Sequence, residues 1–448
     1  MIFDERLAKV PDFKEFFAVK ELLRHAEEVA ATHPNICKIE NLGYSKNNTA
    51  IPMVSIGNGP VSVLLFAFPH PNEPVGAMLS YFLIDELTKD TELRNGRTWH
   101  IIPCIDPDGA SLNEGWFKGP FSIRDYARHY FRTKGEDQVE WSFPIEYKTL
   151  KFDRKVPETI ALMKAITETR PAVMYSLHNS GFGGVYYYIS KPLEGAYETF
   201  YRLPRERQIP LSLGEPEMPF SKVYSPAVFD MPCVTDAYDY YEKYGDGDPA
   251  KHISGGASSR DFADAVCKPI TLVTEVPYFI SPKIADLTKT DKTRKQAILT
   301  GLGKLRRMLT TVQAIIDETI GELTEGTIFS ETTVHFVKQM TANVEDTEIW
   351  ANEDPKLEVQ ATVAQKMDAE YISVFRNMTI FSMYRRALRL QIEKGASKKI
   401  VDAYAKLDNA IECWINEVEQ VLEYEVVPIK HLVEIQYGAL LAVLDALG

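Results

Sequence analysis

The sequence has few cysteines, no long apolar run and no excess of positive charge. Its five cysteines show no Cys-x-x-Cys spacing, which argues against a thiolate zinc site and a disulfide framework. No segment approaches the roughly 20 apolar residues of a membrane-spanning helix, and the opening "MIFDERLAKVPDF" lacks the basic and apolar parts of a signal peptide. We therefore expect a cytoplasmic protein that does not insert into a membrane.

Acidic residues outnumber basic ones, with 63 Asp and Glu against 50 Lys and Arg, so the formal net charge is -13. That balance disfavours general binding to nucleic acid or to an anionic membrane surface. The chain has 448 residues, of which 45% are hydrophobic, and this is enough to bury a large core. We expect one large domain and a smaller one.

Four short apolar runs, rich in β-branched and aromatic residues, predict buried strands. They are residues 61–68, 98–105, 172–178 and 269–276. Helical patterns separate them, as at 75–90 and 157–171, and another opens the chain at 12–32. This alternation predicts an α/β fold with a largely parallel sheet flanked by helices. The Pro-, Gly- and Tyr-rich stretch 200–260 predicts long functional loops or an inserted lobe.

From about residue 290 onward the pattern is almost entirely helical. Residues 294–320 can close the first domain, 321–333 look like a break, and 356–448 hold long amphipathic helices. We predict a catalytic domain at 1–325 and an all-helical C-terminal extension at 326–448. The extension is expected to act as a cap or as the surface of a homo-oligomer.

The pattern His-x-x-Glu occurs at three of the nine histidines, namely His25, His70 and His431. Within an amphipathic helix, as at His25 and His431, such a pair is usually a surface contact between neighbouring turns. His70 differs because it directly follows a predicted strand. Ligands of open α/β sheets bind outside the carboxyl ends of the strands. The pair His70 and Glu73 is therefore a candidate for half of a metal site.

The other three predicted strands also end in polar residues. These are Asp106, Asp108 and Asn113 after the second strand, His178 and Asn179 after the third, and Glu275 at the end of the fourth. Two histidines and one carboxylate, with a fourth position left for water, make an open zinc site of the hydrolytic kind. A further glutamate is needed as general base. We expect His70, Glu73 and His178 to bind zinc and Glu275 to act as the base.

The order and context of these residues resemble those of the M14 zinc carboxypeptidases. The similar segments are "PHPNEPVG", "PCIDPDG", "SLHNSG" and "TEVPYF", spread over about residues 60–280. The resemblance implies an α/β/α sandwich with a mixed eight-stranded sheet and one zinc ion per chain. It also implies an enzyme that removes C-terminal residues from peptides.

The segment "ISGGASSRDFADAVCKPITLVTE" is similar to the loop that shapes the specificity pocket in that family. The resemblance places Arg260 at the position that sets the side-chain preference. An arginine there would favour acidic C-terminal residues, because its guanidinium can hold a carboxylate with two hydrogen bonds. The alternative, that Arg260 only pairs with neighbouring acids, stays open.

The sequence departs from the family in the residues that grip the substrate. Family members carry an Asn-Arg pair for the terminal carboxylate and a further arginine for the scissile carbonyl, but no Asn-Arg dipeptide occurs between Asp108 and His178. We predict that Arg124 stabilises the oxyanion. The substrate-binding candidates are Arg128, Arg132, Arg154 and Asn113.

Two other functions stay open. The "HPNEP" form has no arginine between the ligands, as in deacylases of the same superfamily that release an acyl group from an amino acid. A non-catalytic scaffold whose helical extension binds a partner is the third alternative. We expect a peptide or a small acyl-amino-acid substrate, and neither nucleic acid nor membrane as partner.

Overall fold

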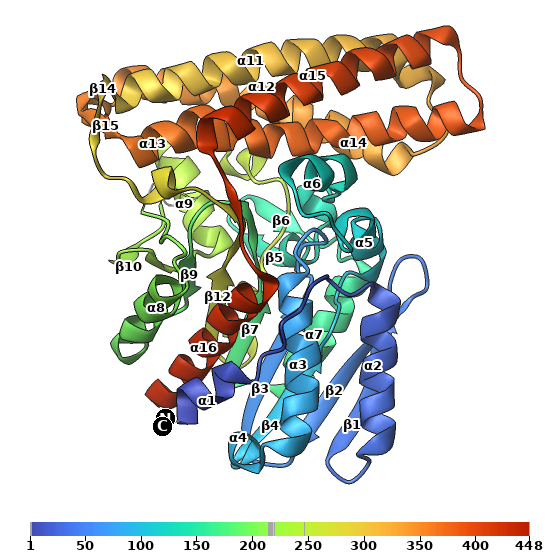
Figure 1. The fold of residues 1–448 in the computed structure, drawn as a ribbon, viewed down its shortest axis with the longest axis vertical. Coiled ribbons are helices and arrows are strands. Elements are labelled where there is room, and N and C mark those ends of the chain that lie inside the picture. Colours follow the sequence, from blue (N-terminus) through green and yellow to red (C-terminus); the bar gives the residue numbers. More distant parts are fainter. Residues whose placement is uncertain (1, 214–217, 219, 246, 448) are drawn as a thin grey trace.

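Nine strands form one mixed sheet at the centre of the body (Figure 1). The computed structural model describes residues 2–213, 218, 220–245 and 247–447. In spatial order the strands are β1 (Cys37–Tyr44), β2 (Ala50–Gly57), β4 (Arg97–Ile102), β3 (Val61–Ala67), β7 (Val173–Leu177), β12 (Ile270–Glu275), β9 (Tyr186–Ile189), β11 (Val228–Asp230) and β10 (Val223–Ser225). The central strands β4, β3, β7 and β12 are parallel, and β2 and β9 join them antiparallel.

Helices cover both faces of the sheet. Residues Val63 and Leu65 of β3 belong to the larger apolar core, whereas Leu64 and Phe66 belong to a second core on the opposite face. The larger core includes residues of α2 (Val19–Thr32), α3 (Val75–Lys89), α8 (Glu194–Glu206) and α16 (Ile429–Leu447). The second includes residues of α7 (Pro157–Thr169), α9 (Val234–Tyr244) and α10 (Ser259–Val266). Burial on both faces explains why the sequence shows continuous apolar runs here rather than alternation.

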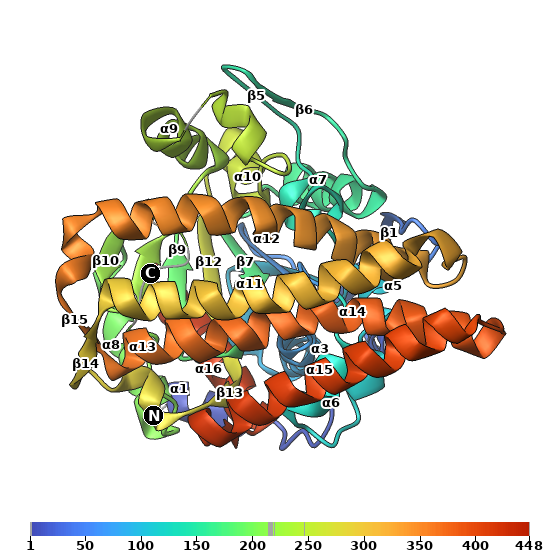
Figure 2. The same cartoon turned by 90° about the horizontal axis from the view of Figure 1, so that it is seen from above.

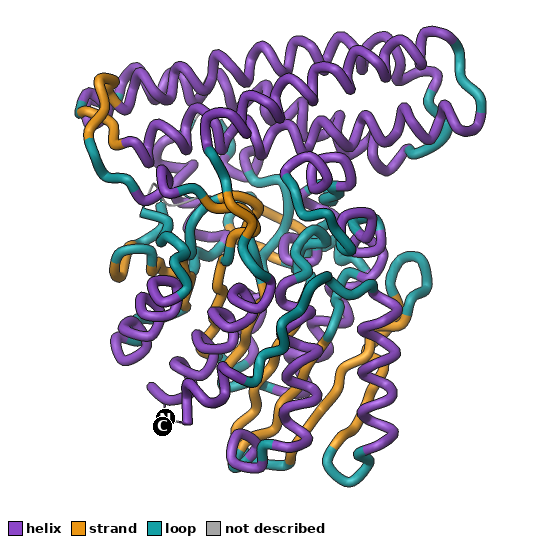
Figure 3. The backbone as a smooth tube through the Cα atoms, in the orientation of Figure 1, coloured by secondary structure: helices purple, strands orange, loops and turns teal. Residues whose placement is uncertain are grey.

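Four long helices pack side by side in a separate layer, which we call the helical layer. They are α11 (Arg294–Thr319), α12 (Thr327–Glu353), α14 (Ser373–Lys394) and α15 (Lys398–Leu422). The helical layer lies across the end of the body at which β3, β7 and β12 finish (Figures 1 and 2). Figure 3 shows the small strand pair β14 (Lys289–Thr293) and β15 (Gln360–Thr362) at one end of the layer, next to α13 (Val363–Met367).

Short elements complete the body. They are α1 (Ile2–Ala8), α4 (Thr91–Arg94), α5 (Pro107–Ser111), α6 (Ile123–His129), β5 (Ile145–Tyr147), β6 (Leu150–Phe152), β8 (Ser180–Phe182), β13 (Pro277–Ile280) and β16 (Glu425–Val426). In the part of the chain that the structure describes, no helix is both long and apolar enough to cross a membrane.

The structure confirms the predicted fold class. The four predicted strands correspond to β3, β4, β7 and β12, and the sheet has nine strands rather than the eight that the resemblance implies. The stretch 200–260 is more regular than expected, since it contains α9, β10 and β11, although residues 214–217, 219 and 246 lie outside the described part.

The predicted domain boundary at residue 325 falls inside the helical layer, between α11 and α12. The last helix, α16, lies outside the helical layer. Helix α16 packs against α8 and α3 on one face of the sheet, beside α1 (Figure 1). Its 19 residues are apolar over most of their surface, as expected for a helix that is buried in the body.

Candidate metal centre

His70 and Glu73 lie in the turn between β3 and α3, at the carboxyl end of the strand. Phe68 enters this turn in the left-handed region, with φ 56°. That conformation costs a non-glycine residue on the order of 1–3 kcal/mol. The Phe68 ring is fully buried and stacks with Phe117 at 6.2 Å, so the surrounding packing holds the strained turn. The turn directs both side chains toward the end of β7, where His178 follows.

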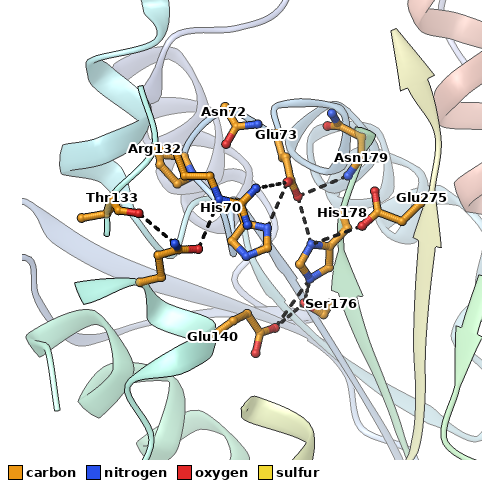
Figure 4. A network of polar contacts seen from close by, with 12 residues as sticks. His70, Asn72, Glu73, Arg132, Thr133, Glu140, Ser176, His178, Asn179 and Glu275 are labelled. Carbon is orange, nitrogen blue, oxygen red and sulfur yellow. Dashed lines mark hydrogen bonds and ion pairs between the residues drawn. The ribbon is translucent and has the colours of Figure 1, made fainter. Parts of the chain in front are cut away.

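His70, Glu73 and His178 form one buried cluster (Figure 4). The Glu73 carboxylate lies between the two rings: its Oε1 is 2.9 Å from His70 Nδ1, and its Oε2 is 2.9 Å from His178 Nδ1. One ligand atom from each residue lies within 4.8 Å of the other two. The three residues are only 7%, 3% and 7% exposed. Their side chains are the ligand types of an open two-histidine, one-glutamate zinc site.

The backbone around the cluster is fixed from both sides. The backbone N–H of Asn179 donates to Glu73 Oε2 at 3.3 Å. From the C-terminal helix α16, the Gln436 side chain donates to the carbonyl of His178 at 2.6 Å. The Tyr278 hydroxyl donates to the carbonyl of Asn72 at 2.9 Å. These bonds tie the two ligand-bearing turns to the sheet and to α16.

The charges around His178 favour a cation. Carboxylate oxygens of Glu73, Glu140 and Glu275 lie 2.9, 3.7 and 3.8 Å from its ring nitrogens. Arg132 contacts Glu73 at 3.4 Å and offsets part of this negative charge. In addition, the buried Nε2 of His70 has no hydrogen-bond partner among the residues that the structure describes. A divalent cation would compensate the buried carboxylates, so the residues present fit a zinc ion.

The two histidines have opposite pKa shifts. Burial lowers the pKa of His70 to about 4, and Arg132 adds to this shift while Glu73 opposes it. Burial also acts to lower the pKa of His178, but Glu73, Glu140 and Glu275 outweigh it and raise the pKa to about 10. Burial acts to raise the pKa of Glu73, yet the two histidines hold it well below its usual value. Zinc binds the neutral form of a histidine, so its binding here is expected to weaken at low pH.

Glu140 lies beside His178, and the sequence analysis did not single it out. Its Oε1 accepts hydrogen bonds from the hydroxyls of Ser176 at 2.6 Å and Ser259 at 3.0 Å, and its Oε2 accepts the backbone N–H of Ser259 at 3.0 Å. Ser176 also lies 2.9 Å from His178 Nε2. Burial acts to raise the pKa of Glu140, but His178 and these donors lower it to about 2. Glu140 thus orients the His178 ring from the side opposite Glu73.

We expect Glu140→Gln to weaken zinc binding about 10- to 100-fold, the usual effect of losing a carboxylate behind a ligand histidine. Competition with a chromogenic chelator measures the affinity. Glu136→Gln is the matched control, because Glu136 lies in the same loop and pairs with the exposed Arg154. If both variants bind zinc as tightly as the wild type, Glu140 does not support the metal site.

Glu275 lies beside the cluster. It is the last residue of β12 and pairs with Tyr186 in the antiparallel ladder with β9. Its Oε1 is 3.8 Å from His178 Nδ1, and the residue is 9% exposed. The structure thus brings together all four residues that the strand ends pointed to.

The arginines are distributed differently from the prediction. Among the predicted arginines, all of which the structure describes, Arg132 reaches the cluster, where it contacts Glu73 and lies 3.3 Å from Gln138. Arg124, predicted to stabilise the oxyanion, instead pairs with Glu412 and Glu419 of α15. The outer face of α6 thus meets the acidic face of α15, a contact between distant segments that no sequence pattern predicts.

Three other candidates also have structural partners. Arg128 pairs with Glu412 at 2.6 Å, and Arg154, whose side chain is 60% exposed, pairs with Glu136 at 2.7 Å. The structure does not bring either arginine to the cluster. Arg260 lies on α10, where it pairs with Asp264 at 3.0 Å and donates to the carbonyl of Met231 at 2.7 Å.

Asn113 is fully buried and serves the loops around the cluster. Its amide nitrogen donates to the carbonyls of Pro71, Gly109 and Phe131, and its oxygen accepts the backbone N–H of Phe131. These contacts occupy the amide hydrogens of Asn113, which the predicted substrate-binding role would need as hydrogen-bond donors. The side chain fixes the turn after His70 and the chain that leads to Arg132.

Several solved structures of known proteins are similar to this chain. A search of curated proteins finds no match. One similar solved structure is a bovine thrombin-activatable fibrinolysis inhibitor bound to a tick carboxypeptidase inhibitor, with 10% identity and a TM-score of 0.40, covering 58% of this chain and 86% of that chain. A second is the carboxypeptidase A of Helicoverpa armigera, with 16% identity and a TM-score of 0.40, covering 62% of this chain and 71% of that chain. A third is a metallo-carboxypeptidase of Burkholderia cenocepacia, with 14% identity and a TM-score of 0.35, covering 57% of this chain and 59% of that chain.

The model of the zinc carboxypeptidase family matches residues 22–263, which is more than half of the chain. The matched segment contains His70, Glu73 and His178 and ends before Glu275. The predicted resemblance, and with it the zinc cofactor, is thereby confirmed. The chain belongs to the zinc carboxypeptidase family, peptidase family M14.

Proposed function

We propose that this protein is a zinc carboxypeptidase that hydrolyses the last peptide bond of its substrates, with Glu275 as general base. The observation that carries the proposal is the position of Glu275 beside the cluster, 3.8 Å from His178, together with its low exposure. A glutamate in that place can reach a water molecule held between the ligands and the substrate.

Each residue then has one task. His70, Glu73 and His178 would hold the zinc ion, which supplies a Lewis acid and lowers the pKa of a water molecule toward neutrality when it is bound. Glu275 takes a proton from the attacking water and returns it to the leaving amine. Arg132 lies beside Glu73 and replaces Arg124 as our candidate for stabilising the negative charge that develops on the scissile carbonyl oxygen.

We expect Arg132→Ala to lower kcat/KM about 10²–10³-fold, the effect of removing one donor to an oxyanion. Arg124→Ala is the matched control, and it should leave kcat/KM unchanged because Arg124 pairs with α15. Steady-state kinetics with one peptide substrate measure both variants. A large loss in the Arg124 variant with none in the Arg132 variant would reverse the assignment.

A preference for acidic C-terminal residues is the finer proposal. Arg260 supports it as a cation at the edge of an apolar cluster that includes Tyr186, Tyr188 and Met231. Its ion pair with Asp264 favours the alternative, because a pocket cation that is already neutralised attracts a substrate carboxylate less strongly. The residues released from a peptide mixture decide between the two.

The test of the function is mass spectrometry of a mixed set of peptides and N-acyl amino acids after incubation with the protein, with and without a zinc chelator. Chelator-sensitive loss of single C-terminal residues supports the carboxypeptidase, and preferential loss of Glu and Asp supports the role of Arg260. Cleavage restricted to the acyl conjugates would identify a deacylase. If nothing is cleaved by zinc-loaded protein, the scaffold alternative stands.

Two further predictions concern the setting of the enzyme. The five cysteines are unpaired, which supports a reducing compartment such as the cytoplasm. The proposed homo-oligomer would form through the helical layer rather than through α16, because α16 packs against α8 and α3 of the body.

A further inference from the structure

The helical layer lies over the carboxyl ends of the strands, which is the side of an open α/β sheet from which ligands enter. The four residues of the candidate centre are correspondingly hidden. His70, Glu73, His178 and Glu275 are 3–9% exposed. A substrate must therefore reach them beneath or beside the helical layer.

Phe375 of α14 connects the helical layer to both ligand-bearing turns. Its ring stacks with Tyr126 at 5.8 Å, and Tyr126 accepts a hydrogen bond from the side chain of Asn72, which lies between His70 and Glu73. The same ring lies over Gly181, three residues after His178. A Cβ at Gly181 would be 2.7 Å from the Phe375 ring, so the ring packs against the Gly181 backbone more closely than a side chain at that position would allow.

Arg386, also on α14, fastens the helical layer to the loops of the site. Its guanidinium donates to the carbonyls of Leu112, His129 and Tyr130 at 2.8–3.0 Å, and it lies over the ring of Phe329 of α12 at 4.2 Å. Burial lowers the pKa of Arg386 to about 10. Because the Arg386 guanidinium donates to backbone carbonyls of three residues, it holds these segments in one arrangement.

Contacts on both sides of Arg386 extend this attachment. On one side Arg124 and Arg128 of α6 pair with Glu412 of α15. On the other side Phe329 of α12 packs against Phe131 with the ring centroids 5.5 Å apart. Tyr130, whose side chain interacts with Arg132, also interacts with Thr379 of α14. Contacts from α12, α14 and α15 thus hold the helical layer to the loops of the site.

We propose that the helical layer is a fixed roof that restricts this enzyme to short peptides and excludes the C-termini of long chains and folded proteins. The proposal rests on the proposed carboxypeptidase function. Neither the family match nor the metal ligands require it, because it follows from the position and attachment of α12, α14 and α15.

The thickness of the roof sets the length limit. A helix with its side chains is about 10–12 Å across, and an extended peptide advances about 3.3–3.6 Å per residue, so a chain needs about three further residues to emerge past the layer. A peptide of up to about four residues therefore does not extend past the layer, whereas a longer one must pass through or beside it.

The test is a series of uncharged peptides with the same two C-terminal residues and lengths of two, four, eight and twelve residues, plus a folded protein that carries the same C-terminal tail. We expect kcat/KM to fall at least about tenfold between the tetrapeptide and the octapeptide, and the protein to resist cleavage. Equal kcat/KM at all lengths would overturn the roof while leaving the function intact. No cleavage at any length by zinc-loaded protein would instead overturn the proposed function.

A pair of variants ties the length limit to the roof. Phe375→Ala removes the ring between α14 and the two turns, and we expect it to raise the ratio of octapeptide to dipeptide kcat/KM at least threefold. Phe381→Ala is the control, because it makes the same change on the same helix but removes a ring that packs on Trp414 of α15 within the layer. Circular dichroism confirms that both variants fold, and an unchanged ratio in a folded Phe375 variant would contradict the proposal.

Discussion

Replacing His178 with alanine should release the zinc ion and abolish hydrolysis. His178 contributes the ligand that is held most firmly, between Glu73 on one side and Glu140 with Ser176 on the other. Because loss of a residue behind a ligand already weakens zinc about 10- to 100-fold, loss of the ligand itself should exceed about 100-fold. Activity falls with the bound zinc, since several kcal/mol of transition-state stabilisation leave with the metal.

The measurements are the zinc content after dialysis against a weak chelator and kcat/KM with a peptide substrate. His431→Ala is the matched control, because His431 has the same His-x-x-Glu spacing but lies in α16 and is no part of the cluster. The control should keep zinc and activity. If His178→Ala retained stoichiometric zinc, the metal centre would have to be placed elsewhere.

The strand ends made the candidate centre predictable. His70, His178 and Glu275 each follow or end a buried strand, and parallel strands deliver their carboxyl ends to one edge of the sheet. The sequence therefore indicated both the residues and their proximity. Glu140 has no such signal, because it lies in a loop with Glu136 and Asp137 and becomes distinct only when that loop folds against Ser176.

The choice among the arginines shows where sequence reasoning ends. Arg124, Arg128 and Arg132 are spaced four residues apart, yet α6 ends at His129. The first two arginines lie on α6 and pair with acidic residues of α15. Arg132 lies beyond the end of α6 and contacts Glu73 instead. Residues of α15 lie nearly 300 positions away in the sequence, so the contact depends on a packing that periodicity cannot predict.

The position of the helical layer was equally hidden. Amphipathic periodicity identified its helices, but the pattern says only that each has an apolar side. The role of Gly181 depends on the ring of Phe375, which packs on it from about two hundred residues later in the chain. The role of Arg386 depends on the backbone carbonyls to which it donates. An expected cap or oligomer surface thus becomes, in the structure, a cover over the end of the sheet.

Glu275→Gln separates chemistry from metal binding more sharply than any ligand variant. Glutamine keeps the size of the side chain and its place at the end of β12, but it cannot accept a proton. We expect kcat to fall about 10²–10⁴-fold, the usual contribution of a general base, while zinc content stays stoichiometric. Zinc analysis and steady-state kinetics on the same preparation test both parts, with Glu136→Gln as the control for loss of one carboxylate.

The zinc affinity of this variant carries a second argument. Glu275 is one of three carboxylates around His178 and contributes to its raised pKa. Its neutralisation lowers the negative charge around the centre, so any change in zinc binding should be a modest weakening, smaller than that caused by His178→Ala. A variant that binds zinc and retains full activity would show that Glu275 is not the base. Since the family match ends at residue 263, that result would leave the zinc site and the family membership intact.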